Sequence, residues 1–215
     1  MQVAVAALLL VLPLLLAPSA VAQPTPITDG NIKAVVSDWT ATPTTATATY
    51  GDIAGWNVAA VTDMGNLFSN KPTFQTDISA WNTASVSSMD SMFNQAAAFN
   101  QDISVWNTAS VSNMNNMFGL AAAFNQSLAG WNTARVANMF STFNGAKAFN
   151  QPLGSWNMAA VTAMSYTFNS ASAFHQPIGS WNVARLSDAS SMFYSASAFN
   201  QNISGVAWRG HSRSE

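Results

Sequence analysis

The sequence contains no cysteine and very little charge. The absence of cysteine among its 215 residues excludes disulfide bonds, thiolate metal sites and cysteine nucleophiles. Charged residues make up 7% of the chain, whereas they make up about 25% of a typical soluble protein. The net charge of −2 gives no electrostatic basis for binding nucleic acid or an anionic membrane surface. The polar surface must therefore come from Ser, Thr, Asn, Gln and the backbone.

Residue types that carry acid–base and nucleophilic chemistry are also scarce. His175 and His211 are the only histidines, and neither has a Ser or Asp partner at the spacing of a known catalytic or zinc motif. Glu215 is the only glutamate, so paired-carboxylate glycosidase chemistry would depend on aspartates alone. We therefore expect a protein that is not an enzyme and that has no catalytic residue, metal or cofactor.

Residues 1–22 are predicted to be a signal peptide. An apolar run rich in Leu, Val and Ala ends in the small-x-small cleavage pattern Ala20-Val21-Ala22. An uncleaved anchor is the alternative, because the run is nearly long enough to span a bilayer. Pro13, the cleavage pattern and the absence of basic flanks favour cleavage. We expect a secreted or cell-surface protein with no membrane span after signal removal.

The rest of the chain repeats every 25 residues. Six tryptophans mark the repeat, and each is followed by Asn and, three residues after the Trp, by Ala. Val or Leu, Met, two Phe and Ile or Leu recur in the same register, with Ala189 interrupting the Met positions. The tryptophans are Trp56, Trp81, Trp106, Trp131, Trp156 and Trp181. Such strict periodicity without insertion is typical of stacked repeat architectures.

Each unit is predicted to contain a strand and a short helix. Val86, Met89, Met92 and Phe93 have the spacing of one apolar helical stripe, and residues 99–106 place Phe, Ile and Trp along an extended segment. Since neither element can bury these side chains alone, the units should stack and pair their strands in parallel. The sequence therefore predicts an α/β, leucine-rich-repeat-like solenoid of about seven coils over residues 50–208.

The ends of the chain differ from its middle. Residues 23–49 form a Pro/Thr-rich lead-in, in which an amphipathic stripe predicts a capping helix over residues 28–40. Residues 41–50 are expected to be a loop or a weak edge strand. Residues 209–215 form a tail without a cap, which indicates either a truncated sequence or an end covered by another molecule.

The repeat, written FNqdIsxWNtaxVxxMxxMFxxAxa, resembles that of BspA-like surface proteins. The preamble IKAVVSDW followed by TYGDIAGWN is similar to the usual start of such arrays. The resemblance covers residues 31–205 and implies a leucine-rich-repeat-related fold in a secreted or cell-surface protein. It implies adhesion or protein contacts in the few cases with a function, and it carries over no catalytic or cofactor residue. The chain departs from many relatives by lacking Asp after Trp.

Several recurring columns have a functional and a structural interpretation, and the structural one is favoured in each case. The Trp column would suit sugar stacking, but its phase with Ile and Phe indicates core. The Asn columns would suit a polar binding face, but repeated Asn at turns usually bonds backbone. The Met column indicates core rather than a thioether metal site. The Asp column (Asp52, Asp77, Asp102) suggests calcium only weakly, because no glycine-rich calcium signature accompanies it.

We therefore expect a non-enzymatic repeat protein that presents an extended face to an extracellular protein or glycan. The candidate interaction residues lie where the repeats differ, and they are Arg135, Phe140, Tyr166 and Arg185. A carbohydrate-active parallel-helix enzyme and an ice- or mineral-surface binder are the alternatives. Two N-glycosylation sequons occur, at Asn125 and Asn202, and Asn202 is the better candidate because Asn125 lies in a recurring column.

Overall fold

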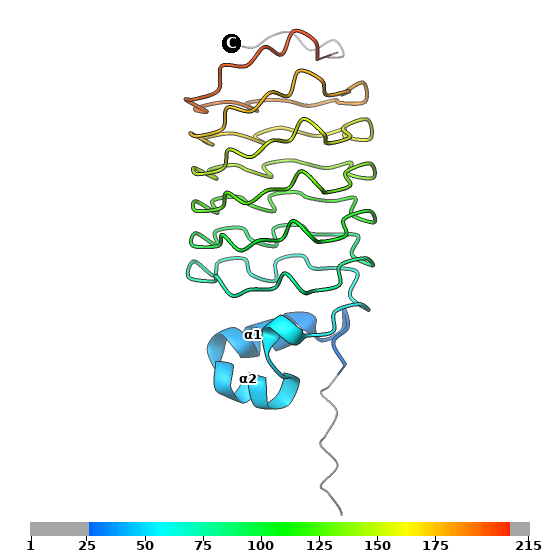
Figure 1. Cartoon of the computed structure of the whole chain (residues 1–215), viewed down its shortest axis with the longest axis vertical. Helices are drawn as coiled ribbons and strands as arrows, with labels where there is room; N and C mark the ends of the chain where they lie inside the picture. The colour runs from blue at the N-terminus through cyan, green and yellow to red at the C-terminus, as the bar shows by residue number, and fades with distance from the viewer. Residues whose placement is uncertain (1–25, 207–215) are drawn as a thin grey trace, which may run out of the picture.

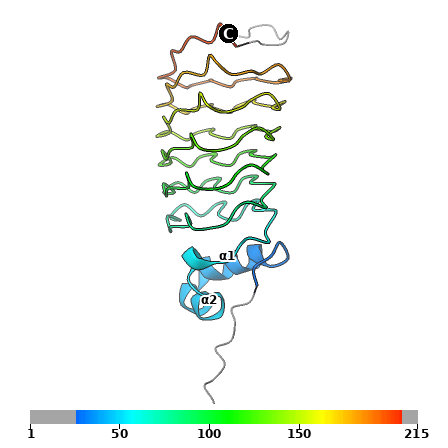
Figure 2. The same ribbon diagram turned by 45° about the vertical axis from the view of Figure 1, so that its right-hand side comes forward.

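The computed structural model describes residues 26–206, which form a column of stacked coils on a helical base (Figure 1). The coils lie one above another in order of sequence, and turning the molecule preserves this arrangement (Figure 2). The predicted signal peptide at residues 1–22 and the predicted tail at residues 209–215 lie outside the described residues. Within residues 26–206, no helix has both the length and the apolar character needed to cross a membrane.

Two helices form the base of the column. α1 (Ile32–Ala41) buries Ile32, Val35 and Val36, the apolar stripe that predicts a helix over residues 28–40. Trp39 at its far end meets the ring of Phe74 edge-on at a centroid distance of 6.3 Å. The helix starts and ends slightly later than expected. α2 (Pro43–Tyr50) follows after one residue, starts with proline at its first position and is capped by Gly51. The expectation of a loop or edge strand over residues 41–50 is therefore wrong.

A polar clamp attaches this base to the first coil. The carboxylate of Asp29 accepts hydrogen bonds from the backbone N–H and the hydroxyl of Thr62 (2.7 and 2.6 Å) and from the N–H of Asp63 (3.0 Å). Lys33 of α1 donates to the Asp63 carboxylate at 2.9 Å. These hydrogen bonds lower the pKa of Asp29, with the Thr62 hydroxyl making the largest contribution. By holding the helical base against the first coil, the clamp keeps the edge of that coil covered.

The coils themselves contain neither α-helices nor extended strands. After η1 (Ile53–Gly55), residues up to 206 contain turns and single parallel β-bridges between adjacent coils. The coil-to-coil bridges are Asp63↔Ser88, Ser88↔Asn113, Asn113↔Asn138, Asn138↔Ala163 and Ala163↔Asp188. The expected α/β, leucine-rich-repeat-like solenoid of strand-plus-short-helix coils is therefore wrong. The stacked units are turn-rich loops instead.

The backbone explains why the helical stripe was misleading. Positions are numbered here from the Trp of each coil, so Met89 is at +8 and Phe93 at +12. Every residue at +10 and +14 has a positive φ, which ends any right-handed helix there. The N–H of Met92 bonds the carbonyl of Met89 (3.2 Å), but the N–H of Met89 bonds Asn113 in the next coil (3.0 Å). Consecutive turns thus reproduce the three- and four-residue apolar spacing of a helix.

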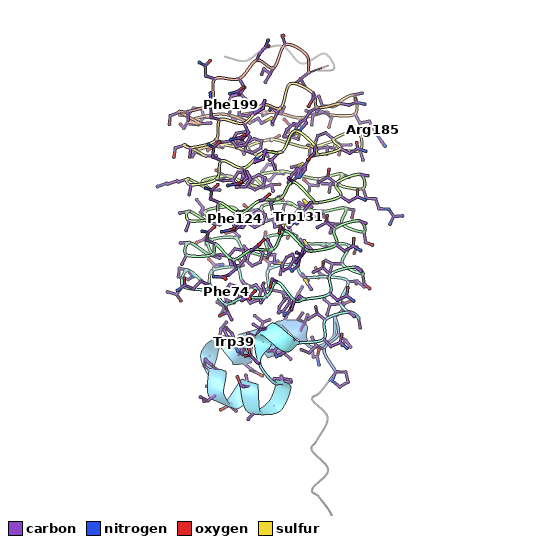
Figure 3. All side chains as sticks on the ribbon, in the orientation of Figure 1. Trp39, Phe74, Phe124, Trp131, Arg185 and Phe199 are labelled. Carbon is purple, nitrogen blue, oxygen red and sulfur yellow. The ribbon has the colours of Figure 1, made fainter. Side chains whose placement is uncertain are left out.

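The core is a set of aromatic ladders that run along the column. Phe residues at +12 stack on one another from coil to coil at 5.5–5.7 Å, and each also stacks on the +18 Phe of its own coil at 3.8–4.1 Å. Figure 3 shows Phe74, Phe124 and Phe199 of the +18 ladder one above another, with Trp131 inside the column. Each of Trp81, Trp106, Trp131, Trp156 and Trp181 donates its indole N–H to the Ile or Leu carbonyl 28 residues earlier. The tryptophan of each coil therefore hydrogen-bonds the backbone of the preceding coil.

Candidate functional site

One side of the column, which we call the ladder face, comprises positions +7 to +14 of each coil. The N–H groups at +8, +10, +12 and +14 donate to the carbonyls at +7, +9, +11 and +13 of the following coil. In the first coil the donors are Met64, Asn66, Phe68 and Asn70, with N···O distances of 2.8–3.0 Å. Side chains at +8, +11 and +12 are mostly buried, whereas those at +9, +10, +13 and +14 provide the surface. This face has a fixed backbone and a surface that varies from coil to coil.

Two of the four predicted interaction residues meet on the ladder face. Phe140 at +9 and Tyr166 at +10 of the next coil are 41% and 40% exposed. Their rings are 5.8 Å apart in an edge-to-face arrangement, which aromatic pairs favour. Ser141 and Ser165, which occupy the same two columns beside them, are buried, whereas Ser190 and Ser191 further along are exposed. The exposed aromatic pair therefore lies where the serines of these two columns are buried.

The other two predicted residues lie apart from this pair. Arg135 and Arg185 are both exposed and share position +4, two coils apart. Figure 3 shows Arg185 projecting from the side of the column. Within residues 26–206 no ion pair or hydrogen bond joins either arginine to Phe140 or Tyr166. The sequence prediction thus combines two separate surface features.

A carboxylate–amide pair precedes the aromatic pair in the +9 column. The side-chain N–H of Asn115 donates to the carboxylate of Asp90, one coil earlier. Asn115 itself is held by its backbone N–H, which donates to Asn113 Oδ1 at 3.0 Å. The +9 column therefore presents Asp90, Asn115 and Phe140 on three successive coils.

The columns that suggested other chemistry are structural. The six repeat tryptophans are only 3–4% exposed, so they offer no stacking surface. Thr83, Thr108 and Thr133, the threonines that an ice-binding surface would need, are 1% exposed, and each donates its hydroxyl to a carbonyl of the next coil. The methionines at +8 are buried as well; they are Met64, Met89, Met114, Met139 and Met164.

An amide ladder runs along another side of the column. Asn100 Oδ1 accepts the backbone N–H of Asn125 (2.9 Å) and the side-chain N–H of Gln126 (3.1 Å) in the next coil. Asn125 does the same for the following coil, and His175 continues this column. The amide of Asn125 is thus held within the ladder. Asn202, the other sequon asparagine, is exposed, and its Oδ1 accepts the backbone N–H of Ser204 in its own turn at 2.9 Å.

The Asp column consists of separate turn-stabilising carboxylates. Asp77 and Asp102 each accept the backbone N–H of a serine two residues later, at 2.8 and 2.9 Å. These hydrogen bonds lower the pKa of both carboxyl groups. Among residues 26–206 no cluster of three or more potential metal ligands forms. His175 contacts Gln201 through its Nε2, and His211 lies outside the described residues.

Sequence reasoning missed several features of the ladder face. Leu120 and Tyr194 are 50% and 68% exposed and lie at +14 and +13, positions where other coils carry small or polar residues. Ser165 Oγ is buried without a hydrogen-bond partner, the only such side-chain atom found among residues 26–206. A column-by-column comparison would have found the exposed residues, because each is the bulkiest of its column. Nothing in the sequence indicates that the hydroxyl of Ser165 is buried without a partner.

Comparison with known families identifies the class of protein. Residues 38–147 and 126–213 both match the family described as Mycoplasma protein of unknown function, DUF285. Together these matches cover most of the chain, so the chain belongs to this family. It is therefore a repeat protein of a family whose function is unknown. No curated protein and no solved structure matches it.

Proposed function

We propose that this chain is a non-enzymatic, secreted or cell-surface protein whose ladder face binds an extracellular protein or glycan. The observation that carries the proposal is the exposed pair Phe140 and Tyr166 on that face. Exposed aromatic side chains are enriched in binding surfaces because they bury a large area at a small entropic cost. Recurring residues build the core, and the aromatic pair occurs only once in the array.

The resemblance to BspA-like surface proteins supports the adhesion-like part of this proposal. Stacked repeats create extended surfaces on which few residues need to change to recognise a new partner. The low charge of the chain favours recognition by hydrogen bonds and aromatic contacts over electrostatic attraction. The proposed partner is therefore an extracellular protein or glycan, and no nucleic acid.

A binding screen tests this proposal. The chain starting at Gln23 would be purified, its fold checked by near-ultraviolet circular dichroism, and the protein applied to arrays of glycans and of cell-surface and matrix proteins. We expect saturable binding to at least one ligand. A folded protein that binds nothing on either array would contradict the proposal.

Export is tested separately. The full chain expressed in a secreting host should appear outside the cell with Gln23 as its first residue, because cleavage is expected after Ala22. N-terminal sequencing of the exported protein gives this result directly. Recovery of the protein only with residues 1–22 intact and membrane-bound would support the anchor alternative.

A further inference from the structure

Four residues of the ladder face form a line parallel to the column axis, which we call the binding strip. They are Asp90, Asn115, Phe140 and Tyr166, one from each of four successive coils. Asn115 is hydrogen-bonded to Asp90, and Phe140 packs against Tyr166. The strip thus presents a polar pair followed by an aromatic pair.

Two features of the strip are unfavourable for folding. Tyr166 has a φ of 59°, in the left-handed region that is unfavourable for a bulky side chain. The same position holds Asn or Ser in the other coils, and Asn tolerates this conformation best. Ser165, directly before it, has a buried hydroxyl without a partner, and such a group is also costly. Local strain and an unsatisfied polar group at one place are typical of functional sites.

The chemistry of the strip favours an uncharged sugar chain. Aromatic rings contact the apolar faces of sugars, while carboxylate and amide groups bond their hydroxyls. Columns +9 and +10 contain no Lys or Arg from Gly65 to Ser191, so nothing on them would attract a sulfated or carboxylated glycan. The coils are spaced by roughly 4.8 Å, as paired strands are, which is close to the length of one sugar unit.

The backbone of the same face argues against an extended peptide as the ligand. Peptides that add to a sheet bond its free edge through main-chain groups. Here the N–H of Asn116 donates to the carbonyl of Phe140 (2.7 Å), and the N–H of Tyr166 donates to Ser190 (2.9 Å). Because these groups are already bonded between coils, recognition depends on side chains.

We propose that the binding strip holds a linear, uncharged oligosaccharide laid along the column axis. One sugar stacks on Phe140 and Tyr166, and the sugars beyond it bond the side chains of Asn115 and Asp90. This inference rests on the proposed function and specifies its ligand class.

Isothermal titration calorimetry with soluble oligosaccharides tests the inference. Neutral hexasaccharides of glucose, xylose, mannose and N-acetylglucosamine would be titrated into the chain starting at Gln23, together with the matching disaccharides and with an oligogalacturonate. The double variant Phe140→Asn, Tyr166→Ser introduces residues that other coils carry at +9 and +10. Val105→Ser is the matched control, since Val105 is 73% exposed and lies next to Trp106, outside the strip.

We expect at least one neutral hexasaccharide to bind more tightly than its disaccharide, and the oligogalacturonate not to bind. The double variant should lose about tenfold or more in affinity, while Val105→Ser should bind like the unsubstituted chain. Tighter binding of the acidic oligosaccharide, unchanged binding by the double variant, or binding of proteins without neutral glycans would each overturn the inference. The last result would leave the broader proposal standing, whereas the absence of any ligand on either array would defeat both.

Discussion

At the scale of single residues, the repeat tryptophans from Trp81 to Trp181 contribute both burial and a hydrogen bond to the preceding coil. Trp131 fills the interior and also donates its indole N–H to the carbonyl of Ile103 at 3.1 Å. Its ring stacks on Trp156 at 6.4 Å. Burial and hydrogen bonding therefore explain together why Trp recurs, where Phe would supply burial alone.

Replacement of Trp131 separates these two contributions. Trp131→Phe removes one of the two hydrogen bonds to the carbonyl of Ile103, which keeps the backbone N–H of Trp106 at 3.2 Å. This loss should cost about 0.5–1.5 kcal/mol in addition to the lost volume. Trp131→Ala should cost about 3–5 kcal/mol. Urea unfolding followed by circular dichroism measures both values. Equal stability of Trp131→Phe and the unsubstituted chain would contradict the role assigned to the hydrogen bond.

Gly145 and Leu120 are predicted to be energetically coupled. Gly145 has a φ of 68°, and a Cβ there would lie 2.6 Å from Cδ2 of Leu120 in the preceding coil. Gly145→Ala should therefore destabilise the protein by about 1 kcal/mol from backbone strain plus the cost of moving Leu120. In the Leu120→Ala background, Gly145→Ala should destabilise the protein less, because the cost of moving Leu120 is then absent. Strict additivity in thermal unfolding would show that the side chain of Leu120 moves freely.

At the scale of elements, α1 was predicted from the sequence and α2 was not. Ile32, Val35 and Val36 gave the correct stripe for α1. α2 was missed because its Thr-rich sequence has low helix propensity and little apolar surface. The helix forms because proline starts it and because it packs against α1. The coils were predicted incorrectly because stacked turns and a helix produce the same apolar spacing.

Attachment of α1 to the first coil should depend on pH. The folded-state pKa of Asp29 is lowered by its hydrogen bonds to Thr62 and Asp63. The pKa of Asp63 is also lowered, because Lys33 and the N–H of Gly65 outweigh the opposing effect of burial. A lowered pKa means that this stabilisation is present above the unfolded-state value of about 4 and is lost as the pH falls through the folded-state pKa.

Hydrogen exchange by mass spectrometry measures this attachment. Peptides from α1 should exchange faster in Asp29→Asn than in the unsubstituted chain at pH 7, and the two proteins should converge once the pH falls below the folded-state pKa of Asp29, after correction for intrinsic rates. Asp38→Asn, an exposed substitution on α1 itself, is the control. A difference that persists unchanged at low pH would contradict the assigned role of the Asp29 carboxylate.

At the scale of the whole molecule, the 25-residue period and the set of buried positions could be predicted from the sequence. Phe, Met, Val and Trp at fixed offsets are buried in nearly every coil, as their recurrence indicates. The path of the backbone could not be predicted, because left-handed residues at +10 and +14 include Asn, Ser, Gln, Leu and Tyr and share no sequence signature. Of the candidate site, the residues Phe140 and Tyr166 were predicted, whereas the edge-to-face contact between their rings depends on coil stacking.

A stack of equivalent coils should tolerate loss of one complete period. Deletion of residues 107–131 joins Trp106 to Asn132 and keeps every column in register. The shortened chain should fold with lower stability, since each coil contributes mainly through its neighbours. Deletion of residues 107–118 breaks the register and should abolish the cooperative unfolding transition. Failure of both deletion variants to fold would contradict the equivalence of the coils.

The most direct test of the account compares binding before and after the predicted interaction residues are made like the rest of the array. One variant carries Phe140→Asn and Tyr166→Ser on the ladder face, and a second carries Arg135→Ser and Arg185→Ser outside it, each change introducing a residue found at the same position in another coil. Titrated against whichever ligand the arrays identify, the first variant should be folded and should have lost its affinity, whereas the second should bind like the unsubstituted chain. Undiminished binding by the folded first variant would show that the ladder face is not the interaction surface.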